Sequence, residues 1–348
     1  MKIKDLTNYL ESIAPANYQE SYDNAGLIVG DPATELSGVL VCLDSTEAVV
    51  EEAIAKKCNL IVAHHPIVFK GLKRLNGRNY VERTVIKAIR NEIAIYAIHT
   101  NLDNVYAQGV NAKIAEKLGL EDTHILAPKA EMKKLFTFVP ATHSEVIRKA
   151  LFAVGAGQVL PHNELSFSTL GVGSQDGQNG AQVKLEVVFP SGNQSAVLKA
   201  LDEQFSGAAY DIMQVENSTP EVGSGMIGTF KKPMTEEAFL KFLKKNMQTE
   251  LVRHTQLLGN KISKVAICGG AGSFLLSRAI QQKADVFITA DYKYHEFFDA
   301  DGKIVIADIG HFESEQFTID LLYEIISEKF SNFALHCTEV KTNPVNYF

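Results

Sequence analysis

The stretch at residues 60–66, with the sequence LIVAHHP, constrains the fold of this chain more than any other. Four consecutive apolar residues predict a short buried strand, and Pro66 ends it because proline cannot donate to a sheet ladder. His64 and His65 therefore follow the carboxyl end of a strand, where open α/β sheets bind their ligands. Either both imidazoles belong to a binding site, or one caps the sheet edge and the other is solvated.

The segments around this strand predict a parallel α/β sheet. An apolar strand over 38–44 is followed by a helical pattern and then by the strand over 60–63, and such a βαβ unit makes its two strands parallel. A third strand over 93–98 again runs directly into polar residues. After residue 228 the alternation of strands and helices returns, with strands predicted over 264–268, 285–291 and 303–310.

Residues 128–227 follow a different pattern. Their predicted elements come in the order βαββαβ, which is typical of a ferredoxin-like α+β module. The sequence FVP at 138–140 recurs as VFP at 188–190, and a helical pattern follows each copy. A chain of 348 residues is long enough for two cores. We therefore expect an α/β domain built from two βα-rich halves, 1–127 and 228–348, interrupted by an inserted module over 128–227.

Composition narrows the class of protein. No run approaches 18 apolar residues, and the chain starts without an apolar leader, so neither a membrane span nor a signal peptide is expected. The four cysteines form no C-x-x-C pair, which argues against a thiolate metal site and a disulfide framework and favours a reduced, cytoplasmic protein. The formal net charge of −7 disfavours non-specific nucleic-acid binding, because phosphate backbones attract clustered Lys and Arg.

Histidines and carboxylates collect just after the predicted strands. His311 and Glu315 are four residues apart at the start of a helix, so both side chains lie on one helix face. Imidazoles and carboxylates without thiolates favour Zn²⁺, Mn²⁺, Fe²⁺ or Co²⁺. A set of three histidines and two carboxylates from among the strand-end candidates is more than one catalytic ion needs. Such a set suits two ions that share a bridging carboxylate. The candidates at strand ends are His64, His65, His99, Asp103, Asp291, His295, His311 and Glu315.

Each candidate also has a structural explanation. Asp103 could cap the next helix, Glu315 could lie on a solvated helix face, and His99 could be a buried, hydrogen-bonded residue. The glycine-rich turn at 269–273 could cradle phosphate at a helix N-terminus. It lacks the G-x-G-x-x-G spacing, however, so a tight turn into the helix is the better interpretation, and a dinucleotide-dependent oxidoreductase is disfavoured.

Five motifs occur along the chain in a fixed order: Asp23-Asn24-x-Gly26, Ala63-His64-His65-Pro66, His99-Thr100-Asn101-Leu102-Asp103, Thr289-x-Asp291 with His295, and Gly310-His311-x-x-Ser314-Glu315. In this order they resemble the motifs of the NGG-interacting-factor family, whose bacterial members are called GTP cyclohydrolase 1 type 2 homologues. The resemblance covers 1–127 and 228–348. The middle segment resembles the PII/CutA-like insertion of the longer bacterial members.

The resemblance implies a dinuclear metal site and an assembly. It implies two divalent cations per chain (Zn, Fe or Mn) and a toroidal homohexamer with the metal sites facing an internal cavity. Tyr22 and Met226 depart from the family pattern. The glycine loop at 173–177 also departs from it, and this departure puts a ligand-binding role of the insert in doubt. The implied metal ligands are intact: His64, His65, Asp103, His311 and Glu315, with Glu315 bridging.

Two functions stay open at this point. The first is a metal-dependent hydrolase of a nucleotide-like or phosphorylated small molecule, in which His99, Asp291 or His295 orients a ligand or carries a proton. The name cyclohydrolase comes from the resemblance alone, since no residue specifies GTP. The second is a non-catalytic regulatory or scaffold protein that holds metal and whose insert senses a small molecule or recruits a partner.

Overall fold

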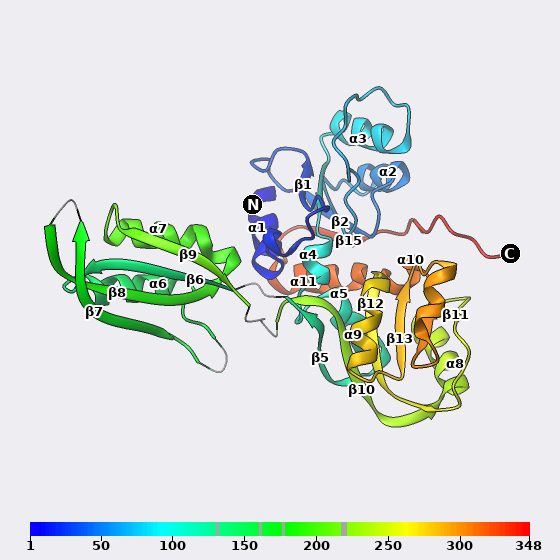
Figure 1. The fold of residues 1–348 in the computed structure, drawn as a ribbon. Coiled ribbons are helices and arrows are strands. Elements are labelled where there is room, and N and C mark those ends of the chain that lie inside the picture. Colours follow the sequence, from blue (N-terminus) through cyan, green and yellow to red (C-terminus); the bar gives the residue numbers. More distant parts are fainter. Residues whose placement is uncertain (130–131, 160–161, 176–177, 217–220) are drawn as a thin grey trace. The chain divides into compact units, whose positions relative to one another are not determined.

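The computed structural model describes residues 1–129, 132–159, 162–175, 178–216 and 221–348 (Figure 1). The chain divides into two compact units, Met1–Pro128 with Pro220–Phe348, and Lys129–Thr219. The strand β10 (Gly223–Thr235) pairs from its first residue with β5 (Glu121–Pro128). Residues 223–227 therefore belong to the larger unit, and the expected insert boundary at 227 lies inside this strand. No helix in the described part of the chain is both long and apolar enough to span a membrane.

The first sheet of the larger unit surrounds the LIVAHHP strand. Its order is β1-β4-β3-β2-β15, and the pairs β2–β3, β3–β4 and β15–β2 are parallel, which confirms the predicted βαβ unit. Thr46 caps the helix of that unit, because its side chain accepts from Val49 N–H. The strands are β1 (Gly26–Val29), β2 (Gly38–Cys42), β3 (Leu60–Ala63), β4 (Ala94–Ala97) and β15 (Ala334–Cys337), with the helices α2 (Glu47–Ala55) and α3 (Tyr80–Arg90).

The second sheet has the order β11-β14-β13-β12-β10-β5. Its three central strands, β12 (Lys261–Ala271), β13 (Val286–Ala290) and β14 (Val305–Asp308), are parallel, and β10 joins them antiparallel. The sequence did not predict β5, because the strand is polar and largely exposed over its first four residues. The short edge strand is β11 (Arg253–His254).

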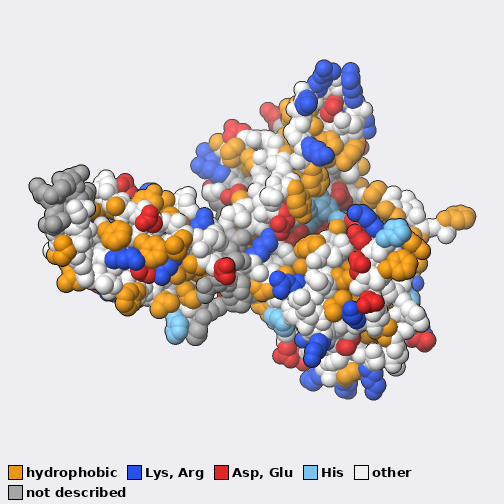
Figure 2. All heavy atoms as spheres, in the orientation of Figure 1, with side chains coloured by type: hydrophobic (Ala, Val, Ile, Leu, Met, Phe, Trp, Pro, Cys, Tyr) orange, Lys and Arg blue, Asp and Glu red, His pale blue; other side chains and the backbone are white. Residues whose placement is uncertain are grey.

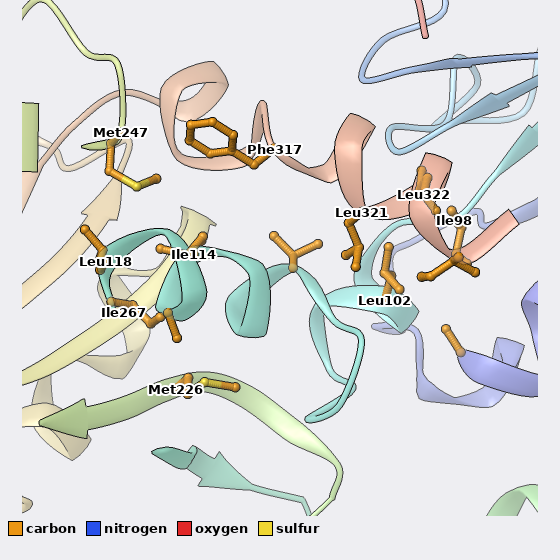
Figure 3. Close-up of a cluster of buried hydrophobic side chains, with 14 of the residues drawn as sticks. Ile98, Leu102, Ile114, Leu118, Met226, Met247, Ile267, Phe317, Leu321 and Leu322 are labelled. Atoms are coloured by element: carbon orange, nitrogen blue, oxygen red, sulfur yellow. The ribbon is translucent and has the colours of Figure 1, made fainter. Parts of the chain in front are cut away.

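One hydrophobic core joins the two sheets. It contains Val39 and Val62 from the first sheet together with Val265 and Val286 from the second. In Figure 3, Ile114 and Leu118 of α5 lie beside Ile267 of β12, while Leu321 of α11 lies near Leu102. The helices packed in or against this core are α1 (Ile3–Ile13), α5 (Val110–Leu118), α8 (Glu236–Asn246) and α11 (Thr318–Lys329). Because the core is shared, the strand ends of both sheets are fixed relative to one another.

Short elements connect these parts. The helix whose start was predicted to carry His311 and Glu315 is in fact two helices, α10 (His311–Glu315) and α11, so these two residues share a separate short helix. Met226, one of the departures from the motif pattern, is buried in the core. The other short elements are η1 (Ala16–Tyr18), α4 (Thr100–Asp103), η3 (Ser273–Leu275), α9 (Leu276–Gln281) and η4 (Tyr294–Ala300).

The smaller unit is a four-stranded antiparallel sheet with two helices. Its elements come in the order β6 (Met132–Pro140), α6 (Ser144–Ala153), β7 (Ser166–Gln175), β8 (Gln178–Pro190), η2 (Ser191–Asn193), α7 (Gln194–Gln204) and β9 (Ala209–Val215). The strand order is β7-β8-β6-β9, with β6 paired to both β8 and β9. Leu135, Leu185, Ile147 and Val197 belong to a core that this unit has to itself.

Candidate metal centre

The parallel strands of both sheets end at one cavity of about 1010 Å³. Residues that follow β2, β3 and β4 line it from the first sheet, and residues that follow β12, β13 and β14 line it from the second. Figure 2 shows acidic and histidine side chains gathered in this hollow. The position agrees with the rule that α/β sheets bind ligands beyond the carboxyl ends of their strands.

Three histidines present the same ring nitrogen to a common point in the cavity. The Nδ1 atom of His64 donates to Ile98 O at 2.9 Å. The Nδ1 atom of His65 pairs with Asp44 Oδ1 at 2.8 Å, and that of His311 pairs with Asp291 Oδ2 at 2.7 Å. Because each Nδ1 is held by an oxygen acceptor, each ring offers Nε2 to a ligand, which is the usual arrangement of histidines that bind metals.

Glu315 lies at the centre of these rings. Its Oε2 is 3.0 Å from His65 Nε2, 3.1 Å from His311 Nε2 and 3.9 Å from His64 Nε2. The Glu315 carboxylate belongs to two groups of side chains whose possible ligand atoms lie within 4.8 Å of one another. The first group is His65, His311 and Glu315, and the second is His64, Asp103 and Glu315. A carboxylate that belongs to two groups of possible ligands suits the role of a bridge between two metal ions.

Two buried atoms at this point have no hydrogen-bond partner. They are His64 Nε2 and Asp103 Oδ1, which lie 3.6 Å apart. Burial lowers the pKa of His64 to about 3, so its Nε2 is an unprotonated acceptor at neutral pH. Burial and the charge of Glu315 raise the pKa of Asp103. A buried lone pair beside a buried carboxylate is costly unless a cation or proton joins them, so the residues present fit a divalent metal ion.

The two other rings hold protons in the absence of metal. Burial alone would lower the pKa of His65, but hydrogen bonds to Asp44 and Glu315 outweigh it and raise that pKa to about 9. In the same way Glu315 and Asp291 outweigh burial and raise the pKa of His311 to about 11. The pKa of Glu315 falls well below its usual value, because these two imidazolium rings outweigh its burial.

His99 borders the same point on the wall of the cavity. Its ring centroid is 5.3 Å from that of His64 and 5.2 Å from that of His65. The Nδ1 atom of His99 pairs with Asp23 Oδ1 at 2.8 Å, and Asp23 also accepts from the N–H and the hydroxyl of Thr100. These bonds outweigh burial and lower the pKa of Asp23 to about 2. Asp23 is therefore a buried partner of His99.

The comparison with known proteins identifies the family. The model of the family DUF34/NIF3 (NGG1p interacting factor 3) matches residues 1–344. The chain belongs to the DUF34/NIF3 family. A Bacillus subtilis protein named GTP cyclohydrolase 1 type 2 homolog is 33% identical over 366 residues, covering 99% of this chain and 98% of that protein. The resemblance inferred from the motifs is thereby confirmed.

Solved structures of NIF3 relatives have the same mixed α/β fold. A Bacillus cereus protein related to NIF3 is 34% identical with a TM-score of 0.82, covering 100% of this chain and 99% of that one. A Staphylococcus aureus protein is 31% identical with a TM-score of 0.82 and the same coverage. The fold of this NIF3 chain, with its several sheets, is therefore shared along its whole length.

The remaining candidate residues of the NIF3 chain lie in different places. Asp291 orients His311, at the edge of the cavity. His295 is exposed on η4, where its ring contacts Tyr294 and Phe298, and it is not among the described residues that line the cavity. The structure therefore groups seven of the eight strand-end candidates and leaves His295 outside.

The glycine-rich turn of the NIF3 chain packs against Glu315 and His311. A Cβ atom on Gly270 would lie 2.4 Å from Glu315 Oε1, and the φ of this glycine is +63°. The amides of Gly269 and Gly270 already donate to Asn111 Oδ1 and Ser314 Oγ, at 3.0 and 2.9 Å. These two donors are used inside the protein and Gly270 packs against Glu315, which supports the interpretation as a tight turn.

Aromatic and acidic side chains line the rest of the cavity. Four exposed aromatic rings belong to this lining: Tyr22, Phe69, Tyr80 and Phe274. Tyr22 is also one of the residues that depart from the family pattern. Arg253 is the only Lys or Arg in the described lining. The acidic members of the lining are Glu20, Asp44, Asp103, Asp291, Asp308, Glu313 and Glu315. This excess of carboxylates favours the entry of cations.

Proposed function

We propose that this NIF3 chain is a metal-dependent hydrolase whose site holds two divalent cations, Zn, Fe or Mn. The observation that carries the proposal is the pair of ligand groups that share Glu315. The unpartnered atoms of His64 and Asp103 support it, because a cation would satisfy both. The proposed ligands are His64, His65, Asp103, His311 and Glu315.

Bound divalent cations lower the pKa of water towards neutrality and stabilise negative charge that develops on a substrate. The residues of the chain would hold and orient the reacting groups. Asp44 and Asp291 fix two ligand rings, and the Ile98 carbonyl fixes the third. Because Asp23 occupies Nδ1 of His99, we assign proton transfer to His99 Nε2. His295 has no part in this proposal.

The size and lining of the cavity support a nucleotide-like or phosphorylated small molecule as substrate. A volume of about 1010 Å³ exceeds what a single metabolite of modest size needs. The exposed aromatic rings can stack on a planar base. The relatives are named GTP cyclohydrolase 1 type 2 homologs, which agrees with a nucleotide-like substrate.

Metal content tests the first step of this proposal. Protein purified without an affinity tag is analysed by mass spectrometry beside His64→Ala and Glu315→Ala. We expect about two ions per chain in the wild type and a loss in both variants. Loaded protein is then screened for hydrolysis of nucleotides and phosphate esters, with Glu315→Ala as the inactive control. A folded chain that stays free of metal after incubation with Zn²⁺, Mn²⁺ or Fe²⁺ would refute the mechanism.

The smaller unit favours a second candidate function, a regulatory protein that holds metal without catalysis. Its elements follow the order βαββαβ around an antiparallel sheet, and it has its own core, so we propose a ferredoxin-like, PII/CutA-like insert that senses a small molecule. Water-proton relaxation of the Mn²⁺-loaded chain separates the two functions. Fast exchange of a bound water favours catalysis, and closed coordination shells favour regulation.

We also propose a toroidal homohexamer in the cytoplasm, with the metal sites facing an internal cavity. The family resemblance supports the assembly, and the four unbridged cysteines suit a reducing compartment. Sedimentation equilibrium should give six times the chain mass of 38.2 kDa. A monomer at micromolar concentration would contradict the assembly without affecting the metal site.

A further inference from the structure

Residues 338–348, which we name the terminal segment, follow β15 without forming a helix or strand (Figure 1). Thr338 N–H still donates to Val41 O at 2.9 Å, beside β15. The hydroxyl of Thr338 then donates to Glu52 on α2, and Glu339 N–H donates to the same carboxylate at 2.9 Å. Glu52 does not line the cavity in the part of the chain that the structure describes. The start of the segment is therefore anchored outside the site.

Thr342 connects the terminal segment to a proposed metal ligand. Its hydroxyl donates to Asp44 Oδ2 at 2.6 Å, and the other oxygen of Asp44 accepts from His65 Nδ1 at 2.8 Å. The side chain of Asp44 is 34% exposed, so burial alone does not hold it in place. A carboxylate orients an imidazole only while its own position is fixed, and here a hydroxyl 298 residues away along the chain fixes it.

Asn343 connects the same segment to the other side of the cavity. Its Nδ2 donates to Glu313 Oε1 at 2.9 Å, and its Oδ1 accepts from Val345 N–H at 3.0 Å. Glu313 is only 8% exposed and lies on α10, the helix that carries His311 and Glu315. Two consecutive residues thus reach the strand ends of both sheets. The segment residues that line the cavity are Thr342, Asn343, Pro344, Val345 and Tyr347.

We propose that the terminal segment is a working part of the metal centre. Thr342 positions His65 through Asp44. Asn343 positions α10 through Glu313. The segment therefore fixes proposed ligands that follow strands of two different sheets, although none of its own residues is among the proposed ligands. This inference rests on the proposed metal site and assigns positioning residues to it.

Thermodynamic linkage allows this role to be measured in two ways, as an effect of Thr342 on cation affinity and as an effect of bound cations on the terminal segment. If the Thr342 hydroxyl strengthens cation binding by some factor, bound cations must hold the segment in place by the same factor. Loss of an outer partner of a metal ligand costs roughly 10–100-fold in metal affinity. Thr342 acts one residue further out than Asp44, so we expect the lower end of that range, about tenfold.

The test compares Thr342→Val with Thr338→Val in the full-length chain. Both changes remove a hydroxyl that bonds a carboxylate from the same segment, but only the bond of Thr342 leads to a ligand. Affinity for Co²⁺ is measured by competition with a chelator, and the absorption of bound Co²⁺ reports its ligand field. We expect about tenfold weaker binding and an altered spectrum for Thr342→Val, with Thr338→Val within about twofold of wild type. Thr342→Ser keeps the hydroxyl and should therefore have the Co²⁺ affinity and the absorption spectrum of the wild type.

Amide exchange of the terminal segment provides the second readout. Co²⁺ should slow exchange over residues 342–345 about tenfold in the wild type and much less in Thr342→Val. Thermal unfolding of the metal-free variants checks that the fold survives. Unchanged affinity and spectrum in Thr342→Val, beside a wild type that binds Co²⁺, would overturn the inference and leave the proposed function intact. A wild type that binds neither Co²⁺ nor Zn²⁺, Mn²⁺ or Fe²⁺ would overturn both.

Discussion

Each histidine proposed as a metal ligand is held by a different acceptor, and the acceptor decides how the ring behaves without metal. His64 donates to a backbone carbonyl in a fully buried position, so it stays neutral. His65 and His311 face carboxylates on both ring nitrogens, which stabilise the imidazolium form. Protons therefore supply part of the positive charge that cations would supply, and metal binding must release them.

The metal-free chain should lose stability as the pH rises above neutrality. The folded-state pKa values of His65 and His311, about 9 and 11, lie above the unfolded value of about 6.5. Their contribution is complete below pH 6.5 and is lost as the pH rises through the folded values. The loss is roughly 1.4 kcal/mol per pH unit for the largely buried His65 and smaller for His311, whose side chain is 38% exposed and therefore screened by solvent. Urea unfolding in EDTA between pH 6.5 and 9 measures this.

The control for this pH dependence is the metal-loaded chain, in which both rings are already deprotonated by their ligand role. Its free energy of unfolding should not fall over the same interval. Equal slopes for the two forms would show that the imidazolium rings do not stabilise the metal-free fold.

Asp291 should matter for metal affinity far more than its exposure suggests. Asp291→Ala removes the acceptor of His311 Nδ1 and should weaken metal binding roughly 10–100-fold, measured by chelator competition. Asp301→Ala is a matched control, because both aspartates have positive φ, at 58° and 46°. Among the residues that the structure describes, the side chain of Asp301 pairs only with exposed Lys303. Similar losses in the two variants would mean that backbone strain, and not orientation of His311, explains the effect.

At the scale of elements, the site depends on how closely β12 approaches α10. Gly270 near the end of β12 leaves space for Glu315, and Gly310 with φ of +92° turns the chain into α10. At position 270 glycine is required for two reasons: its φ is positive, and a Cβ atom there would clash with Glu315. The sequence shows the glycines, but only the structure shows which carboxylate they accommodate.

Gly270→Ala should therefore displace Glu315 and reduce metal content below two ions per chain. Gly302→Ala is the control, because its φ is +65° against +63° for Gly270, while no atom lies within 4 Å of its added Cβ. Strain alone should cost about 1 kcal/mol in each variant. Mass spectrometry should find fewer ions only in Gly270→Ala, and full occupancy there would show that Glu315 adapts without losing its ligands.

The strand-end pattern predicted most of the site because it depends on local sequence. Apolar runs fix where β3, β4 and β14 end, and parallel packing then brings the residues just beyond those ends together. Partners that are distant along the chain were not predictable in this way. Asp23 and His99 are 76 residues apart, and Asp44 and Thr342 are 298 apart. The strand β5 was missed for a related reason, since its partner β10 and not its own periodicity makes it a strand.

At the scale of the whole molecule, all residues of the proposed metal centre belong to the larger unit. All five proposed ligands lie in Met1–Pro128 and Pro220–Phe348, whose two sheets share one core. The smaller unit has its own core. Pro128 at the end of β5 and Gly223 at the start of β10 are paired across an antiparallel ladder, so the chain leaves and re-enters the larger unit at adjacent points.

Replacing residues 129–220 by Asn-Gly should therefore leave the proposed metal centre intact. Glu221 and Val222 stay, because Glu221 O accepts from Tyr106 N–H and Val222 is buried in the larger unit. The paired ends Pro128 and Gly223 are then joined by a short hairpin loop, a connection that is common between adjacent antiparallel strands. We expect a cooperative thermal transition and the same number of ions per chain as in the wild type, measured by mass spectrometry. Loss of the ions from a folded variant would show that the smaller unit contributes to metal binding. Loss of the cooperative transition would show that the larger unit depends on it for stability.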